Sequence, residues 1–105
     1  LDLHLNGKLK EAYATLLSLI KNDTSNVKAY LKLGQVIREI GNSERALKIH
    51  RGLLIRKDLT NYESIELFKN IALDYKDLKR INNSISQCLE ILKIEKFIYN
   101  FQKTH

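Results

Sequence analysis

Apolar side chains recur at intervals of three and four residues along almost the whole chain, which is the period of an amphipathic α-helix. Short clusters of turn-forming residues divide this pattern into five stretches. The pattern predicts helices over residues 8–22, 27–40, 43–56, 61–78 and 82–98. With no alternating strand pattern beside them, the expected fold class is all-α.

Each expected helix carries one apolar stripe that should face a shared core. In chain order the stripes are Leu9, Ala12, Tyr13, Leu16, Leu17 and Ile20; Val27, Tyr30, Leu31, Leu33, Ile37 and Ile40; Ala46, Leu47, Ile49, His50, Leu53 and Leu54; Ile65, Phe68, Ile71, Ala72 and Tyr75; and Ile85, Cys88, Leu89, Ile91 and Leu92.

The residues between the stripes are those that begin and end helices. The segment 23–26 reads Asp-Thr-Ser-Asn, a cluster of turn and N-cap formers, and Gly41-Asn42 should stop the second helix. Thr60 and Glu63 have the spacing of a capping box, which predicts a helix start there. The pair at 82–83, Asn-Asn, is expected just before the last helix.

The chain also repeats itself. Gly7 and Gly41 lie 34 residues apart, as do Ala12 and Ala46. A weaker third copy places Ser84 at an offset of 38 from Ala46, and the four extra residues fall in the connection 56–62. A period in this range is typical of stacked helix pairs that bury a continuous core only together. An ordinary antiparallel bundle with accidental periodicity is the alternative.

Small residues at fixed positions support close helix packing. Gly34 lies in the middle of an expected helix, where glycine costs about 1 kcal/mol relative to alanine. We expect a neighbouring helix to approach it closely, and Ala12, Ala46, Ala72 and Ser84 to be small for the same reason.

The spacing of Tyr30, Leu33, Gly34, Ile37, Gly41, Ala46, His50 and Leu53 resembles the tetratricopeptide repeat. The resemblance implies a right-handed superhelix of antiparallel helix pairs in one domain, 1–105. Residues 1–24 would end one repeat, 27–58 and 61–96 would form the next two, and 97–105 would be a C-terminal extension. The chain departs from the family in having tyrosine or phenylalanine for the usual tryptophan, and it has no proline.

A narrower resemblance rests on the runs Arg-Ala-Leu-Lys-Ile-His-Arg-Gly-Leu-Leu at 45–54, Leu-Thr at 59–60 and Ala-Leu-Asp-Tyr at 72–75. These runs and the lengthened loop are similar to the lipopolysaccharide assembly protein B family. The resemblance implies a cytoplasmic adaptor tethered to the inner membrane, which regulates lipopolysaccharide synthesis by linking the deacetylase that commits lipid A synthesis to a membrane-bound AAA+ protease. That family also has an N-terminal membrane helix and a C-terminal CxxC metal site; we expect this chain to be a piece of a longer protein.

The charge of the chain leaves several partners open. The 105 residues carry 18 basic and 12 acidic side chains, a formal net charge of +6, spread along the sequence. Such a balance suits solubility, nucleic acid, an anionic membrane surface or an acidic protein. An RNA-binding solenoid is therefore an alternative, but no nucleic acid is expected because Tyr30, Phe68 and Tyr75 fall on core positions rather than on a stacking surface. No stretch of about 20 apolar residues predicts a membrane span.

Candidate catalytic chemistry is sparse, and we expect a non-enzyme with no cofactor and no metal. The sequence has no GxGxxG, phosphate-binding Gly-Lys-Ser/Thr, HExxH or CxxC motif. His50 and Cys88 occupy positions usually filled by a core residue, so each is expected to be buried, with His50 bonded to a neighbouring group. Asp74 is expected on a helix surface beside a packed tyrosine.

The first helix of each pair should line a concave groove that holds a protein or peptide with acidic groups. The expected groove residues are Lys28, Leu31, Lys32, Gln35, Arg38, Lys69, Asn70, Leu73 and Lys76, a mostly cationic set, with Glu66 on the same side. The carboxylate clamp of some tetratricopeptide proteins is not reproduced, since Leu31 and Gln35 stand where lysine and asparagine are needed.

Two further surfaces follow from the same helical geometry. Arg45, Lys48, Arg51 and Arg56 should lie on the outer face, either solvated or against lipid headgroups. The aromatic tail from Phe97 onward should pack back, begin another repeat or form a homo-oligomer contact.

Overall fold

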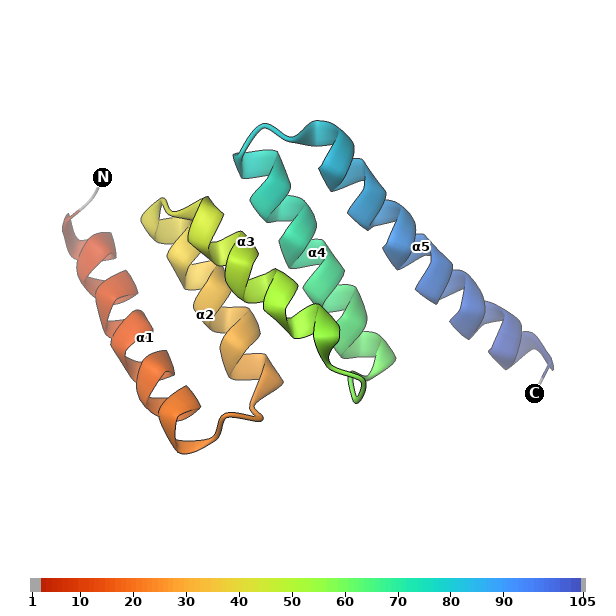
Figure 1. Cartoon of the computed structure of the whole chain (residues 1–105), viewed down its shortest axis with the longest axis horizontal. Coiled ribbons are helices and arrows are strands. Elements are labelled where there is room, and N and C mark those ends of the chain that lie inside the picture. Colours follow the sequence, from red (N-terminus) through yellow and green to blue (C-terminus); the bar gives the residue numbers. More distant parts are fainter. Residues whose placement is uncertain (1–2, 105) are drawn as a thin grey trace.

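A computed structural model describes residues 3–104, with side chains from 7 to 103. The described residues form five α-helices: α1 (Leu3–Asn22), α2 (Val27–Ile40), α3 (Ser43–Gly52), α4 (Asn61–Asp77) and α5 (Ile81–Thr104). A single 3₁₀ turn, η1 (Leu53–Ile55), follows α3 (Figure 1). The predicted all-α class is confirmed for this part of the chain.

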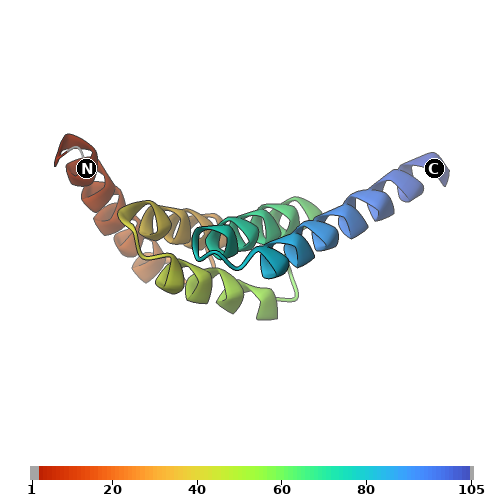
Figure 2. The same cartoon turned by 90° about the horizontal axis from the view of Figure 1, so that it is seen from above.

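Successive helices run in opposite directions and lie side by side in chain order, giving an elongated molecule of 51 × 34 × 22 Å (Figure 1). Seen from above, α2 and α4 share one side of the molecule, and α3 lies on the other side (Figure 2). α1 and α5 slope away from α3 at the two ends, so the side that carries α2 and α4 is the hollowed one.

The helix ends that carry a capping signal in the sequence form where it predicts them, because the required bonds are local. Asn26 caps α2 by accepting a bond from the Ala29 N–H at 3.0 Å. Thr60 and Glu63 make both bonds of the capping box, at 3.0 and 2.9 Å. Gly41 ends α2 in the left-handed conformation, with φ of 110°.

The turns from α2 to α3 and from α4 to α5 repeat the same backbone bonds at the offset of 38 seen in the sequence. The N–H of Gly41 donates to the Arg38 carbonyl at 2.9 Å, and the N–H of Lys79 donates to the Lys76 carbonyl at 3.0 Å. A second matched pair joins Asn42 to Ile37 at 3.0 Å and Arg80 to Tyr75 at 2.8 Å. The third copy of the repeat is therefore a repeat of backbone structure, although its side chains have diverged.

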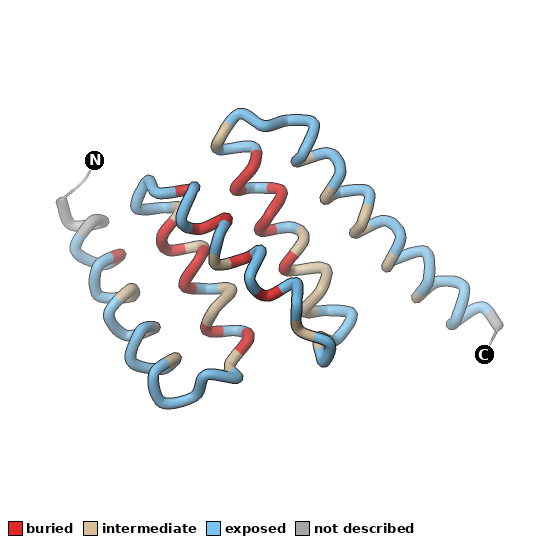
Figure 3. Tube along the Cα trace, in the orientation of Figure 1, coloured by how far each residue is buried: buried red, intermediate tan, exposed pale blue. Residues whose placement is uncertain are grey.

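The core lies in the middle of the molecule, among α2, α3 and α4 (Figure 3). One apolar cluster joins α3 and η1 to α4 through Leu47, Leu53, Leu67, Ile71 and Tyr75. A second cluster joins α2 to α3, and Tyr13, Leu16 and Ile20 of α1 pack against it. Since a helix pair alone leaves its apolar stripe exposed to solvent, each pair is stabilised mainly by packing against its neighbours.

Gly34 is small because a side chain from the next helix fills the space beside it. The imidazole of His50 lies so close that a Cβ on Gly34 would stand 2.2 Å from Nε2. No ordinary contact is that short, so only glycine fits at this crossing of α2 and α3. The expected close approach at Gly34 is confirmed.

Several helix boundaries differ from the prediction. The first helix begins at Leu3 rather than at residue 8, and the fourth ends at Asp77 rather than at residue 78. The helix expected over 43–56 ends as an α-helix at Gly52 and tightens into η1. Arg56 is also not a free outer-face residue, because it donates to the carbonyls of Ser25 and Thr24 at 3.0 and 2.8 Å and stacks over Tyr30. The last helix begins at Ile81, ahead of the two asparagines, and continues through the tail to Thr104.

The prediction of a buried stripe on α5 is largely wrong. Cys88 is exposed, and Ile85 and Leu89 are each 53% exposed. Leu92 is 59% exposed, while Ile91 is half-buried. α5 packs against α4 on one side, and within the described chain nothing covers the side that carries Cys88. Leu17 and Leu54 are likewise more exposed than predicted, at 40% and 41%.

Across residues 3–104 no helix is both long enough and apolar enough to cross a bilayer.

Candidate functional site

Two hollows open along α2 and α4. The first has a volume of about 320 Å³ and the second of about 520 Å³. Helical geometry explains their place, because residues three and four apart on α2 face residues three and four apart on α4. Together the hollows form the α2–α4 groove, the name used below.

Most of the predicted groove residues line these hollows. Lys28, Leu31, Lys32, Gln35 and Asn70 line the first. Arg38, Leu73 and Lys76 line the second, whereas Lys69 is exposed and lines neither.

The groove also contains residues outside the predicted set. Tyr62 lines the first hollow and is 68% exposed, beside Glu66, which was expected on this side. Glu39, Asp77 and Lys79 line the second. Helical spacing could have predicted some of these groove residues. Positions 62, 66 and 70 are four residues apart, as are 35 and 39, so each set shares one helix face.

The lining is therefore mixed in charge: its cationic residues, Lys28, Lys32, Arg38, Lys76 and Lys79, outnumber the three acids, Glu39, Glu66 and Asp77. Glu66 faces the two lysines of the first hollow, and two acids stand in the second. On α2, Gln35 bridges a basic and an acidic side chain: it accepts a hydrogen bond from Lys32 at 3.5 Å and donates one to Glu39 at 3.2 Å. A ligand of mixed charge would meet complementary groups here.

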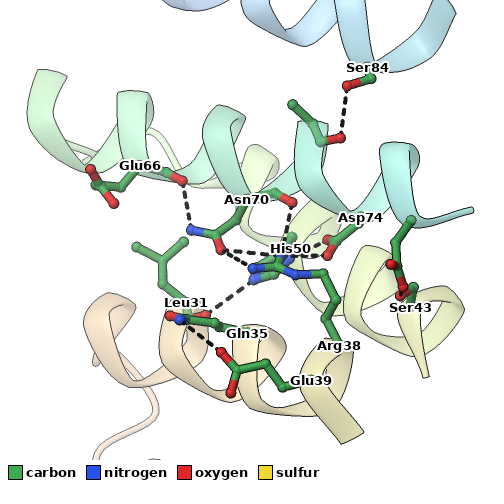
Figure 4. A network of polar contacts seen from close by, with 12 residues as sticks. Leu31, Gln35, Arg38, Glu39, Ser43, His50, Glu66, Asn70, Asp74 and Ser84 are labelled. Carbon is green, nitrogen blue, oxygen red and sulfur yellow. Dashed lines mark hydrogen bonds and ion pairs between the residues drawn. The ribbon is translucent and has the colours of Figure 1, made fainter. Parts of the chain in front are cut away.

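Arg38 does not offer its charge to a ligand, because it is bound beneath the groove (Figure 4). Its Nη1 donates to Asp74 Oδ1 at 2.8 Å and to the Asn70 carbonyl at 3.3 Å. Nη2 donates to the Asn70 side chain at 3.4 Å, and Asn70 in turn donates to the Glu66 carbonyl at 2.9 Å. Arg38 and Asn70 therefore hold α2 against α4 and form the floor between the hollows.

Asp74 is the centre of this network and is fully buried, so its predicted place on a helix surface is wrong. Its second oxygen accepts a bond from His50 Nδ1 at 2.5 Å. A carboxylate removed from water needs such partners, and Asp74 has a cation on one oxygen and an imidazole on the other.

His50 is buried and bonded on both ring nitrogens, which confirms the prediction for this residue. Nε2 donates to the Leu31 carbonyl of α2 at 3.2 Å, while Nδ1 donates to Asp74 of α4. Both ring nitrogens therefore have an oxygen partner, one on α2 and one on α4. One side chain of α3 thus joins the helices that carry the groove.

This network is placed for structure rather than for reaction. His50 and Asp74 are each 0% exposed, so a substrate could not reach them. Within residues 3–104, no group of three His, Cys, Asp or Glu side chains is arranged to hold a metal ion. What the groove offers is an open, partly charged surface on a rigid floor, which suits binding.

Comparison with known proteins gives one kind of relative. The chain is similar to lipopolysaccharide assembly protein B from Escherichia coli strain K12, with 31% identity over 71 residues. The same protein from E. coli O6:H1 and from O157:H7 matches equally. The match covers 68% of this chain but 18% of each relative. No family model matches, and no solved structure matches.

Proposed function

We propose that this chain is a tetratricopeptide-like, non-catalytic scaffold that acts in lipopolysaccharide assembly by holding a segment of a partner protein in the α2–α4 groove. The role in lipopolysaccharide assembly rests on the similarity to lipopolysaccharide assembly protein B. The scaffold reading rests on the groove itself, and this observation carries the proposal.

The repeat supports the tetratricopeptide part of the proposal. The same pair of turn bonds recurs at an offset of 38, and Gly34 lets α3 pack closely on α2. Helix pairs stacked in this way give extended concave surfaces that bind peptides. Such a surface is hollowed on the side of α2 and α4.

The chemistry of the groove indicates what it would hold. In the first hollow, Leu31 and Tyr62 offer apolar contacts, Lys28 and Lys32 attract a carboxylate, and Glu66 attracts a cation. We therefore propose an extended or helical peptide that carries an apolar anchor between charges of both signs. Nucleic acid is not part of the proposal, because a strand of uniform negative charge would meet acids in both hollows.

The finer proposal follows the family resemblance. The partner would be the deacetylase that commits lipid A synthesis, the membrane-bound AAA+ protease, or both in turn. The chain would then work at the cytoplasmic side of the inner membrane, tethered by a segment outside the sequence described here.

A binding measurement with paired charge reversals tests the groove. The purified deacetylase and protease are each titrated against the chain by biolayer interferometry. Reversal of two groove charges by Lys28→Glu with Lys32→Glu should weaken partner binding at least about ten-fold, since like charges then face the partner's acid. The matched control is Lys8→Glu with Lys10→Glu, which makes the same charge change on exposed positions of α1.

The two variants separate the outcomes. Equal loss in both would mean that net charge rather than the groove drives binding, and would remove the proposal. Groove-dependent capture of a protein outside lipopolysaccharide assembly would keep the scaffold but assign it to another assembly.

A further inference from the structure

Exposed basic and aliphatic residues gather at the end of α3 and in the turn that follows it. Figure 2 shows α3 on the side of the molecule opposite α2 and α4. Lys48, Arg51 and Lys57 are exposed, Leu54 is 41% exposed, and Ile55 is 84% exposed. We call these five residues the basic tip. Lys48 and Arg51 share one face of α3 by their spacing, and Ile55 follows at the end of η1.

The cations of the basic tip have no acidic partners. The ion pairs among the described residues join Arg38 and His50 to Asp74, and Lys93 to Glu90. Lys48, Arg51 and Lys57 take part in none of them. Their charge is therefore available to a partner, unlike that of Arg38 in the groove.

Ile55 is presented by a fixed turn. Next to it, Arg56 donates to the carbonyls of Ser25 and Thr24 at 3.0 and 2.8 Å, and its own N–H donates to the Leu53 carbonyl at 3.1 Å. Ile55 also borders a hollow of about 370 Å³ with a largely apolar floor, formed by Tyr30, Ile49, Gly52 and Leu53, with Lys48 and Arg56 beside it. An exposed apolar side chain with cationic side chains next to it is typical of residues that bind at a membrane–water interface.

Charge distinguishes the two sides of the molecule. Segment 43–58 carries five basic and two acidic side chains, whereas α2 and α4 together carry five of each. The side that carries the basic tip is thus the cationic side, and it would attract an anionic surface. The exposed apolar residues there are aliphatic, which favours insertion among lipid chains over stacking on nucleic-acid bases.

We propose that the basic tip docks the protein on an anionic lipid bilayer, with Ile55 and Leu54 entering the headgroup region and Lys48, Arg51 and Lys57 on lipid phosphates. This orientation leaves the α2–α4 groove facing away from the membrane. The inference does not rest on the groove or on its partner.

Vesicle co-sedimentation tests the charge part of the proposal. The chain should bind vesicles of phosphatidylcholine with 30% phosphatidylglycerol and fail to bind pure phosphatidylcholine. Lys48→Glu with Arg51→Glu should lower the bound fraction at least about ten-fold. Lys8→Glu with Lys10→Glu is the matched control on α1 and should change it less than about two-fold. Far-UV circular dichroism checks that both variants remain helical.

An environment-sensitive dye tests the insertion part. Labelled at Ile55→Cys in a Cys88→Ser background, the dye should shift to the blue when phosphatidylglycerol vesicles are added. Labelled at the native Cys88, which is exposed on α5, it should not shift. Both positions are exposed, so the comparison reports which surface meets the membrane.

Four outcomes would overturn the proposal. These are equal binding to neutral vesicles, equal loss in both charge variants, a dye shift at Cys88 but not at 55, and binding of a single-stranded RNA oligonucleotide that is tighter than vesicle binding and depends on Lys48 and Arg51. The last would assign the surface to nucleic acid.

Discussion

The hairpin of α2 and α3 and the hairpin of α4 and α5 turn through the same backbone bonds, but their outer helices meet different surroundings. On α3, Ala46, Leu47 and His50 are all buried. The positions 38 residues later on α5 are Ser84, which is half-buried, and Ile85 and Cys88, which are exposed.

The difference shows that the turn is a property of the hairpin itself, whereas burial of its second helix depends on the neighbouring helices. The turn needs only a few local bonds, so it forms in both hairpins. Burial of the outer helix needs another helix beside it: α4 covers α3, and within the described residues nothing does the same for α5. Repeated sequence positions therefore predict orientation within a pair, but not burial.

The largest effect should come from breaking the polar network that joins α2, α3 and α4. Asp74→Ala removes the carboxylate that binds Arg38 and His50. The Arg38 guanidinium and the His50 imidazole then each lose a hydrogen-bond acceptor inside the protein. We expect a loss of about 3–5 kcal/mol in the free energy of unfolding, measured by urea denaturation. Asp77→Ala on the same helix loses one bond to Ser43 and should cost about 1 kcal/mol. Similar losses in the two variants would contradict the central role of Asp74.

A second comparison uses matched apolar positions. Leu47 is 5% exposed, and its counterpart Ile85 is 53% exposed. Leu47→Ala should therefore cost about 2–5 kcal/mol and Ile85→Ala less than about 1 kcal/mol in urea denaturation. A loss at Ile85 as large as that at Leu47 would mean that α5 is covered in solution, which analytical ultracentrifugation would then trace to self-association.

The smallest effect should appear at the turns themselves. Gly41 and Lys79 occupy the same place in the two hairpins, and both have positive φ, at 110° and 63°. This conformation is strained for a side chain, so Lys79→Gly should raise stability by about 0.5–1 kcal/mol, after allowance for the extra freedom of glycine in the unfolded chain. Gly41→Ala should lower it by about 1 kcal/mol. Thermal unfolding measures both; a drop in stability for Lys79→Gly would show that the lysine side chain makes a compensating contact.

The sequence predicted the features whose causes lie within a few residues. The capping box at Thr60 and Glu63, the stop at Gly41 and the cap at Asn26 depend on neighbours three or four positions away. The helical period also fixes which residues of α2 and α4 share a face, and most of the residues expected on that face line the two hollows. Lys69 was misplaced because it lies next to that face rather than on it.

Features set by distant residues escaped prediction. Asp74 is buried because Arg38 and His50, 36 and 24 residues away, reach it, and nothing near Asp74 in the sequence signals this. The sequence also carried no sign that the charge of Arg38 would be bound by Asp74 rather than offered to a ligand. Cys88 was expected inside because its counterpart on α3 is inside.

The one-sided packing of α5 has a consequence for motion. Ser84 bonds to the Ala72 carbonyl at 2.9 Å near the start of α5, while the far end carries Phe97 and Tyr99, which are 63% and 62% exposed. Because the side of α5 away from α4 is open to solvent, its amides should exchange with solvent before those of α4, which lies between α3 and α5.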